Sequence, residues 1–358
     1  MNIYFWLVVF IILMAIIFRG EEKKKWFLIT VFFALFFVMG FRHAAVVGVD
    51  SASSYLETFK AMKKTNPVFE TNFAFFYLMK LIYIITGGNY HIYSILISGF
   101  VIFSYYYLAK KYATNALVTV FWFLGMGFYT FLFSALKQAI AMAILCYAFD
   151  AIMKKKPIRF VIIVSVAACF HFPALVFLPA YWIAKMDIGR YYFLFLGALL
   201  AFTFAFRTQI ITWMSQSYKG EESSYVNPSV QFFGTKVIIM ILLVVLAYVL
   251  RTPGKEDRLY TVLLLFMGIA IVFQTFSYYS NVFERLADYY YIFSIFCMPM
   301  VFENTGEYPT MITAKTLSAV NIAGTVVVSV FSIWRFLSSV AAPAAHMLPY
   351  LFCWEPLR

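Results

Sequence analysis

Long apolar runs separated by short polar connections dominate the hydrophobic pattern of the chain. The runs cover residues 2–18, 26–41, 91–108, 116–133, 137–152, 158–171, 173–184, 191–206, 236–250, 259–277, 288–302 and 317–339. A helix that crosses a bilayer needs about 20 largely apolar residues, or somewhat fewer when its ends reach for the headgroups. The runs lack the strict alternation of transmembrane strands. The pattern predicts an all-α polytopic integral membrane protein with about 12 transmembrane helices.

One further apolar piece, residues 73–86, is short and contains Lys80. If it crossed the membrane, the basic clusters Lys110–Lys111 and Lys154–Lys156 would both lie outside the cell. Basic residues favour the cytoplasmic ends of spans. We therefore expect 73–86 to be a short or re-entrant element on the outer side.

Composition and charge support this assignment. The chain is 64% hydrophobic and only 12% charged, whereas soluble domains carry roughly twice that charged fraction. The net charge of +12 does not indicate nucleic-acid binding, because the basic residues form short clusters between apolar runs, as the positive-inside rule requires. We expect one transmembrane domain over 1–358, with outer loops at 42–90 and 208–235.

Polar groups at membrane depth are costly, so each needs a reason. Lys137 and Gln138 begin the apolar helix expected at 137–152. A helix N-terminus already carries partial positive charge, which disfavours a lysine there unless it meets an anion. Free backbone N–H groups beside Lys137 and Gln138 would suit a phosphate. The alternative is that Lys137 only reaches for the headgroups.

Two residues are candidate general bases. Asp50 follows Gly48 in "GVDSASSY" and either caps a helix or takes a proton from an acceptor hydroxyl. His171 precedes Pro173 between two short apolar segments, where irregular backbone is tolerated if it lines a cavity. A lone histidine is more often a structural hydrogen-bonding group, but neutral imidazole can also accept a proton.

Late in the chain, "ERLADYYYIF" places Glu284 and Arg285 before a run of tyrosines. Arg285 either pairs with Glu284 or Asp288, or its planar fork binds a phosphate. Arg42 marks the outer end of the second apolar run. Three cations, Arg42, Lys137 and Arg285, thus share the expected outer face. This arrangement suits an anionic lipid-linked substrate with a pyrophosphate leaving group. No carboxylate cluster marks a metal site, and no cofactor is expected.

In their order, "GVDSASSY", "LKQAIAMAI" followed by "KKK", "HFPALVFLPAYW" and "ERLADYYYIF" resemble the EpsG-like family of bacterial exopolysaccharide and O-antigen polymerases, part of the Wzy-type group. The resemblance also includes the closing "LPYLFCWEP" and runs across almost the whole chain. By position, Lys137 and Gln138 match the family's Arg-Gln pair. Lysine keeps the charge at this position but loses the bidentate fork.

The resemblance implies a helical bundle similar to the GT-C-like membrane glycosyltransferases. It also implies an enzyme that joins undecaprenyl-pyrophosphate-linked oligosaccharide units at the outer face of the cytoplasmic (inner) membrane of a bacterium, with no metal. Its partners would be that substrate, membrane lipid, a chain-length regulator and a flippase, but no nucleic acid. Arg42, Lys137, Gln138 and Arg285 would bind pyrophosphate. Either His171 or Asp50 would be the catalytic base, and Tyr55 and Glu284 would contact glycan.

Two rival classes remain. A flippase of the same lipid-linked units would have charges open to both sides of the membrane and paired halves. A membrane O-acyltransferase also uses a histidine, but it usually draws its acyl donor from the cytoplasm. The expected one-sided polar set argues against the first, and the expected outer position of His171 argues against the second.

Overall fold

The computed structural model describes residues 3–43, 46–48, 54–188, 192–209, 212, 234–250, 257–277, 281–302 and 314–356. The chain forms two compact units. The first contains Met1–Leu175 together with Ala323–Arg358, and the second contains Val176–Ile322. The described residues are helical or irregular and contain no strand, which confirms the predicted all-α class.

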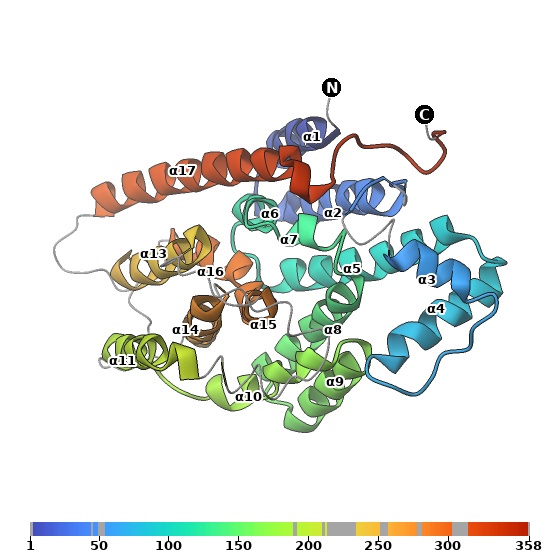
Figure 1. The fold of residues 1–358 in the computed structure, drawn as a ribbon. Helices are drawn as coiled ribbons and strands as arrows, with labels where there is room; N and C mark the ends of the chain where they lie inside the picture. Colours follow the sequence, from blue (N-terminus) through green and yellow to red (C-terminus); the bar gives the residue numbers. More distant parts are fainter. Residues whose placement is uncertain are drawn as a thin grey trace. The chain divides into compact units, whose positions relative to one another are not determined.

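The first unit holds most of the helices that the structure describes, and Figure 1 draws them in blue to green, with its C-terminal part in red. They are α1 (Ile3–Ile17), η1 (Glu21–Lys23), α2 (Lys24–Gly40), α3 (Leu56–Ala61), α4 (Phe73–Thr86), α5 (Tyr90–Tyr112), α6 (Ala116–Gly125), α7 (Phe128–Phe131), α8 (Leu136–Met153), α9 (Pro157–Phe170), the later part of α17 (Ala314–Ala341) and η5 (Pro343–Ala345). Within this unit α8 packs against α5 and α9, and α5 also packs against α2 and α4.

The second unit is arranged around α14. Its helices are α10 (Ala180–Ile183), α11 (Tyr192–Ala205), α13 (Thr235–Leu250), α14 (Arg258–Phe276), α15 (Asn281–Tyr291) and α16 (Ser294–Val301), and η3 (Phe172–Phe177) joins the two units along the chain. Helices α10, α11, α13, α15 and α16 all contact α14.

The helices follow the predicted apolar runs closely, with three interruptions. The run 173–184 is divided into η3 and α10, which are separated by Leu178 and Pro179. The run 116–133 is divided into α6 and α7 at Gly127, whose positive φ of 82° favours glycine. The run 288–302 falls across the end of α15 and all of α16. The ambiguous piece 73–86 is the helix α4.

Length separates the helices into two groups. Within the described residues, four helical stretches are long and apolar enough to cross a bilayer: Tyr90–Tyr112, Leu136–Met153, Arg258–Phe276 and Ala319–Ala341. Other apolar helices among the described residues are shorter, with 10–17 residues each. The predicted count of about 12 full spans is therefore not confirmed. The single domain over 1–358 and the GT-C-like bundle stay predictions.

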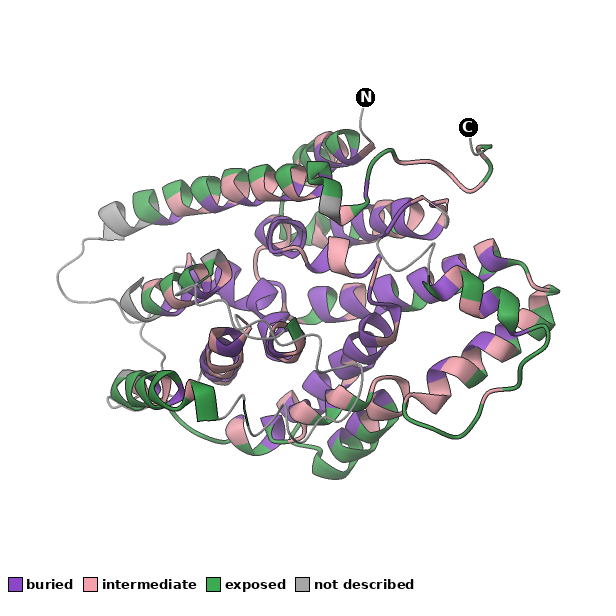
Figure 2. Ribbon diagram, viewed as in Figure 1, coloured by how far each residue is buried: buried purple, intermediate pink, exposed green. Residues whose placement is uncertain are grey.

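Helix α8 is the most completely buried of the long helices (Figure 2). Fifteen of its residues are buried, including Gln138 near its start and Asp150 near its end. By contrast, only 17% of the most apolar part of α17 is buried. A buried helix flanked by two others holds the residues at its first turn in a fixed position, which matters for the site described next.

A four-donor cluster anchors the far end of α8. The Asp150 carboxylate accepts hydrogen bonds from Lys111 Nζ at 2.7 Å, Lys154 Nζ at 2.8 Å, Tyr112 Oη at 2.9 Å and Tyr107 Oη at 3.1 Å. Three of these donors come from α5, so the cluster joins the two helices. A buried carboxylate is tolerated when it is paired and hydrogen-bonded in this way.

Candidate functional site

At the opposite end of α8, Lys137 contacts aromatic rings of α4. Its Nζ lies 4.6 Å from the ring centroid of Phe76 and 5.6 Å from that of Phe75. Among the described residues this half-buried ammonium has no hydrogen bond and no ion pair. A cation–π contact contributes about 0.5–2 kcal/mol and does not neutralise the charge. The site therefore presents a positive charge that lacks a counter-anion among these residues.

The small residues flanking Lys137 occupy the interior of the first unit. Ala135, Ala139 and Ala143 are all buried, and Gln138 is buried beside them. Small side chains at this spacing let a neighbouring helix approach closely. The first turn of α8 is thus held by packing on several sides, and Lys137 extends from this fixed position toward α4.

His171 lies at the C-terminal end of α9, and this end is tied to the start of α4. The backbone N–H of His171 donates to the Ala167 carbonyl at 3.0 Å and closes the helix. The next residue, Phe172, donates its N–H to Asn72 Oδ1 at 2.8 Å. Asn72 is the residue before α4 and has a positive φ of 64°. His171 is therefore held beside the first turn of α4.

Tyr55 reaches the same turn. Its ring packs edge-on against Phe75, with centroids 5.7 Å apart and an angle of 63° between the planes. Phe75 thus contacts both Tyr55 and Lys137. Residues 72–76 form the place where three predicted site residues, Tyr55, Lys137 and His171, come together in the first unit. We call this place the α4 turn.

Arg42 is also in the first unit but is directed inward. Its side chain is buried and donates to the carbonyl oxygens of Met39 and, at 3.4 Å, Phe133. The guanidinium also lies 4.9 Å from the Phe133 ring centroid. Burial lowers the pKa of Arg42, and the nearby tyrosines partly oppose this shift. These contacts fix the segment that leads into α8, so they favour a positioning role over direct contact with a ligand.

Asp50, the other candidate base, lies outside the described residues. Its predicted roles as a base or a helix cap stay predictions. Among the described residues, no group of three His, Cys, Asp or Glu side chains is placed to hold a metal ion.

Arg285 and Glu284 lie on α15, in the second unit. The cation that bridges the acidic residues of this helix is Lys236, from α13. Its Nζ lies 2.6 Å from Asp288 Oδ1 and 3.0 Å from Glu284 Oε1. Arg285 itself is exposed on α15. That Arg285 and the α4 turn form one site stays a prediction, because Arg285 belongs to the second unit and the α4 turn to the first.

Sequence reasoning missed Phe75, Phe76 and Lys236. The aromatic run around Phe75 is visible in the sequence, but no local spacing connects it with residue 137. Lys236 begins an apolar run and had no apparent partner. An ion pair between α13 and α15 depends on tertiary packing, which sequence periodicity does not report.

The apolar helices, many with exposed large hydrophobic side chains, together with the four long spans define a multi-pass helical membrane protein. The chain belongs to the EpsG family, whose model matches residues 25–352. This confirms the resemblance found in the sequence motifs. Family membership supports a polymerase-like membrane protein of polysaccharide biosynthesis. No curated protein and no solved structure matches the chain.

Proposed function

We propose that the protein is a polysaccharide polymerase that joins undecaprenyl-pyrophosphate-linked oligosaccharide units at the outer face of the cytoplasmic membrane. One observation carries the proposal: the Lys137 ammonium at the α4 turn has aromatic contacts and no acidic partner among the described residues. Family membership supplies the chemical context. The product would be exopolysaccharide, capsule or O-antigen.

The electrostatics of Lys137 favour an anionic ligand. A charged side chain costs about 2.5–3.5 kcal/mol at the centre of a membrane helix by insertion scales, which is an upper bound for Lys137 in the first turn of α8, and the aromatic contacts contribute about 0.5–2 kcal/mol toward offsetting the cost. A phosphate about 4 Å away contributes about 4 kcal/mol at the effective dielectric of a protein surface. Binding a pyrophosphate would therefore remove the remaining cost, whereas a neutral ligand would not.

The reaction follows from placing the donor's pyrophosphate at Lys137. An acceptor hydroxyl oxygen attacks the anomeric carbon of the donor glycan and forms the glycosidic bond. The bond from that carbon to the pyrophosphate oxygen breaks, and its electron pair leaves with undecaprenyl pyrophosphate. Lys137 stabilises the negative charge that develops on this leaving group. The hydroxyl proton passes to His171 or to Asp50 acting as general base.

The other residues have supporting roles in this proposal. Gln138 and the first-turn N–H groups of α8 hydrogen-bond the pyrophosphate. Tyr55 contacts glycan at the α4 turn, and Arg42 positions the segment before α8. Arg285 binds the second phosphate if the two units bring α15 to this site, with Glu284 contacting glycan.

The test is the length profile of polysaccharide from a deletion strain that carries wild-type protein, Lys137→Ala, Lys137→Arg or Lys60→Ala at matched membrane abundance. Lys60 is the matched control, because it pairs with Glu57 at 2.9 Å on an exposed surface. Losing one charge-stabilising donor lowers a rate about 100-fold. We expect Lys137→Ala to collapse the ladder to single units, and Lys137→Arg and Lys60→Ala to keep it.

An unchanged ladder in Lys137→Ala would overturn the proposal and leave Lys137 as a headgroup anchor. A second measurement distinguishes a polymerase from a flippase. Lipid-linked units in the deletion strain are assayed for access from outside the membrane. Units at the outer face support a polymerase, whereas units trapped at the inner face would identify a flippase.

A further inference from the structure

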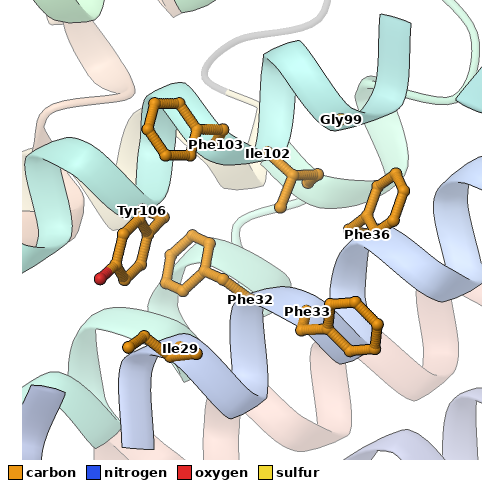
Figure 3. A pocket seen from close by; sticks show the side chains of 8 residues that line it. All are labelled: Ile29, Phe32, Phe33, Phe36, Gly99, Ile102, Phe103 and Tyr106. Atoms are coloured by element: carbon orange, nitrogen blue, oxygen red, sulfur yellow. The ribbon is translucent and has the colours of Figure 1, made fainter. Parts of the chain in front are cut away.

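Away from the α4 turn, an apolar groove of about 300 Å³ runs between α2 and α5 in the first unit (Figure 3). Its lining is aromatic and aliphatic apart from one glycine and one tyrosine hydroxyl: Ile29, Phe32, Phe33, Phe36, Gly99, Ile102, Phe103 and Tyr106. Phe33 and Phe103 are 64% and 57% exposed. The groove therefore opens onto the exposed surface of this helix pair, where a membrane protein contacts lipid.

The two helices run antiparallel, and their contacts fix the register. The rings of Phe32 and Tyr106 lie 6.0 Å apart. A Cβ added to Gly99 would meet the Phe36 ring at 3.4 Å. The start of α2 therefore lies beside the end of α5.

At that end, each helix carries a lysine one turn beyond the groove. Lys25 precedes Ile29 by four residues, and Lys110 follows Tyr106 by four residues, so each lies on the groove-lining face of its helix. Both lysines are exposed, and among the described residues neither has an ion pair. The Lys25 Nζ lies 5.7 Å from the ring of Trp26, an aromatic type enriched at headgroup level.

The other end of the groove is closed. A Cβ on Gly40 would lie 3.5 Å from the Ile95 Cα and 3.2 Å from the Phe36 ring, so the two helices touch there. From Lys25 to Phe36, and equally from Lys110 to Gly99, α-helical rise gives a length of about 16 Å. Half of a bilayer's hydrocarbon core is about 15 Å. The groove thus has a cationic mouth and an apolar body as long as one leaflet.

We propose that this groove binds an anionic phospholipid, with an acyl chain between α2 and α5 and the phosphate between Lys25 and Lys110. Charge complementarity selects the occupant, because a zwitterionic lipid would bring its own cation to the two lysines. The polyprenyl donor fits less well. Its pyrophosphate is assigned to Lys137, whereas the mouth of the groove lies at the basic ends of α2 and α5, which the charge pattern places on the cytoplasmic side.

Native mass spectrometry of the full-length detergent-purified protein with phosphatidylglycerol or phosphatidylcholine of matched chains tests the proposal. Each juxtamembrane lysine changes anionic-lipid affinity about fivefold, so Lys25→Ala with Lys110→Ala is expected to weaken phosphatidylglycerol binding about 25-fold. Lys23→Ala with Lys156→Ala is the matched control. It removes the same charge from exposed positions off the groove, and we expect wild-type binding.

A second variant tests the groove itself. Gly99→Leu adds a side chain whose Cβ meets only the Phe36 ring, so we expect it to fold and to displace the lipid. Three results would each overturn the proposal. The first is an equal loss of phosphatidylglycerol binding in the Lys23/Lys156 control, and the second is equal binding of phosphatidylcholine by the wild type. The third is unchanged phosphatidylglycerol binding in Gly99→Leu. Displacement of phosphatidylglycerol by an equimolar polyprenyl phosphate would also overturn it and assign the groove to the donor's chain.

Discussion

Replacing Asp150 by asparagine removes the charge that joins α5 to α8 while keeping the size of the side chain. Each carboxylate oxygen of Asp150 now accepts from one lysine and one tyrosine: Oδ1 from Lys111 and Tyr112, Oδ2 from Lys154 and Tyr107. Asparagine converts one of these oxygens into an NH₂ group. The lysine on that side would then face another donor whichever way the amide is turned, whereas the tyrosine hydroxyl there can rotate and accept from the NH₂ group.

The magnitude follows from these contacts. Hydrogen bonds to a charged group contribute about 1.5–3 kcal/mol each; one lysine bond is lost outright, and the remaining bonds weaken because the carboxylate charge is gone. The lysine side chains are 32% and 45% exposed, so water can solvate part of the released charge, which reduces the loss. We expect Asp150→Asn to lower the free energy of unfolding by about 2–4 kcal/mol.

The assay is thermal unfolding of purified protein in detergent, followed by tryptophan fluorescence. For a unit of roughly 200 residues this loss corresponds to a decrease in Tm of about 5–15 °C. Glu57→Gln is the matched control. It breaks an ion pair whose side chains are 62% and 60% exposed, and such pairs contribute about 0–1 kcal/mol. A decrease for Asp150→Asn no larger than for the control would refute the reasoning.

Three further substitutions test the packing. Lys236→Ala leaves the buried carboxylate of Asp288 without its partner and should destabilise the protein by about 3–5 kcal/mol, measured by the same thermal assay; a change below 1 kcal/mol would contradict it. Gly125→Ala places a Cβ 2.5 Å from the Cα of Ser332 and should cost about 1–3 kcal/mol, whereas an unchanged Tm would show that the two helices separate easily. Asn89→Ala removes the cap of α5 and should cost about 1 kcal/mol, visible as faster hydrogen exchange at His91; unchanged exchange would argue against the cap.

The sequence predicted helices well where apolar runs ended at clear boundary signals. The expected run 91–108 became Tyr90–Tyr112, which starts at the Asn89 cap, and 137–152 became Leu136–Met153. The run 116–133 was interrupted because Gly127 adopts a positive φ, and an apolar window cannot detect one such residue. The count of full spans was set by run length alone, whereas several of the observed helices are short.

The candidate site was predictable by residue type but not by contact. Lys137 was singled out because a lysine at a helix start requires an anion. Its actual neighbours, Phe75 and Phe76, lie about sixty positions earlier. The same limit applies to Arg42. Its charge was evident in the sequence, but its burial against Phe133 depends on how α2 packs.

Phe75 has a consequence for how substitutions at the α4 turn combine. Its ring contacts both Tyr55 and Lys137. Residues that share a partner do not act independently, so the free-energy changes of two substitutions around this ring should not add. A double-mutant cycle of Tyr55 and Lys137 should show a coupling energy that vanishes when Phe75 is replaced by leucine. Sequence change at any one of these three positions therefore alters what is tolerated at the other two.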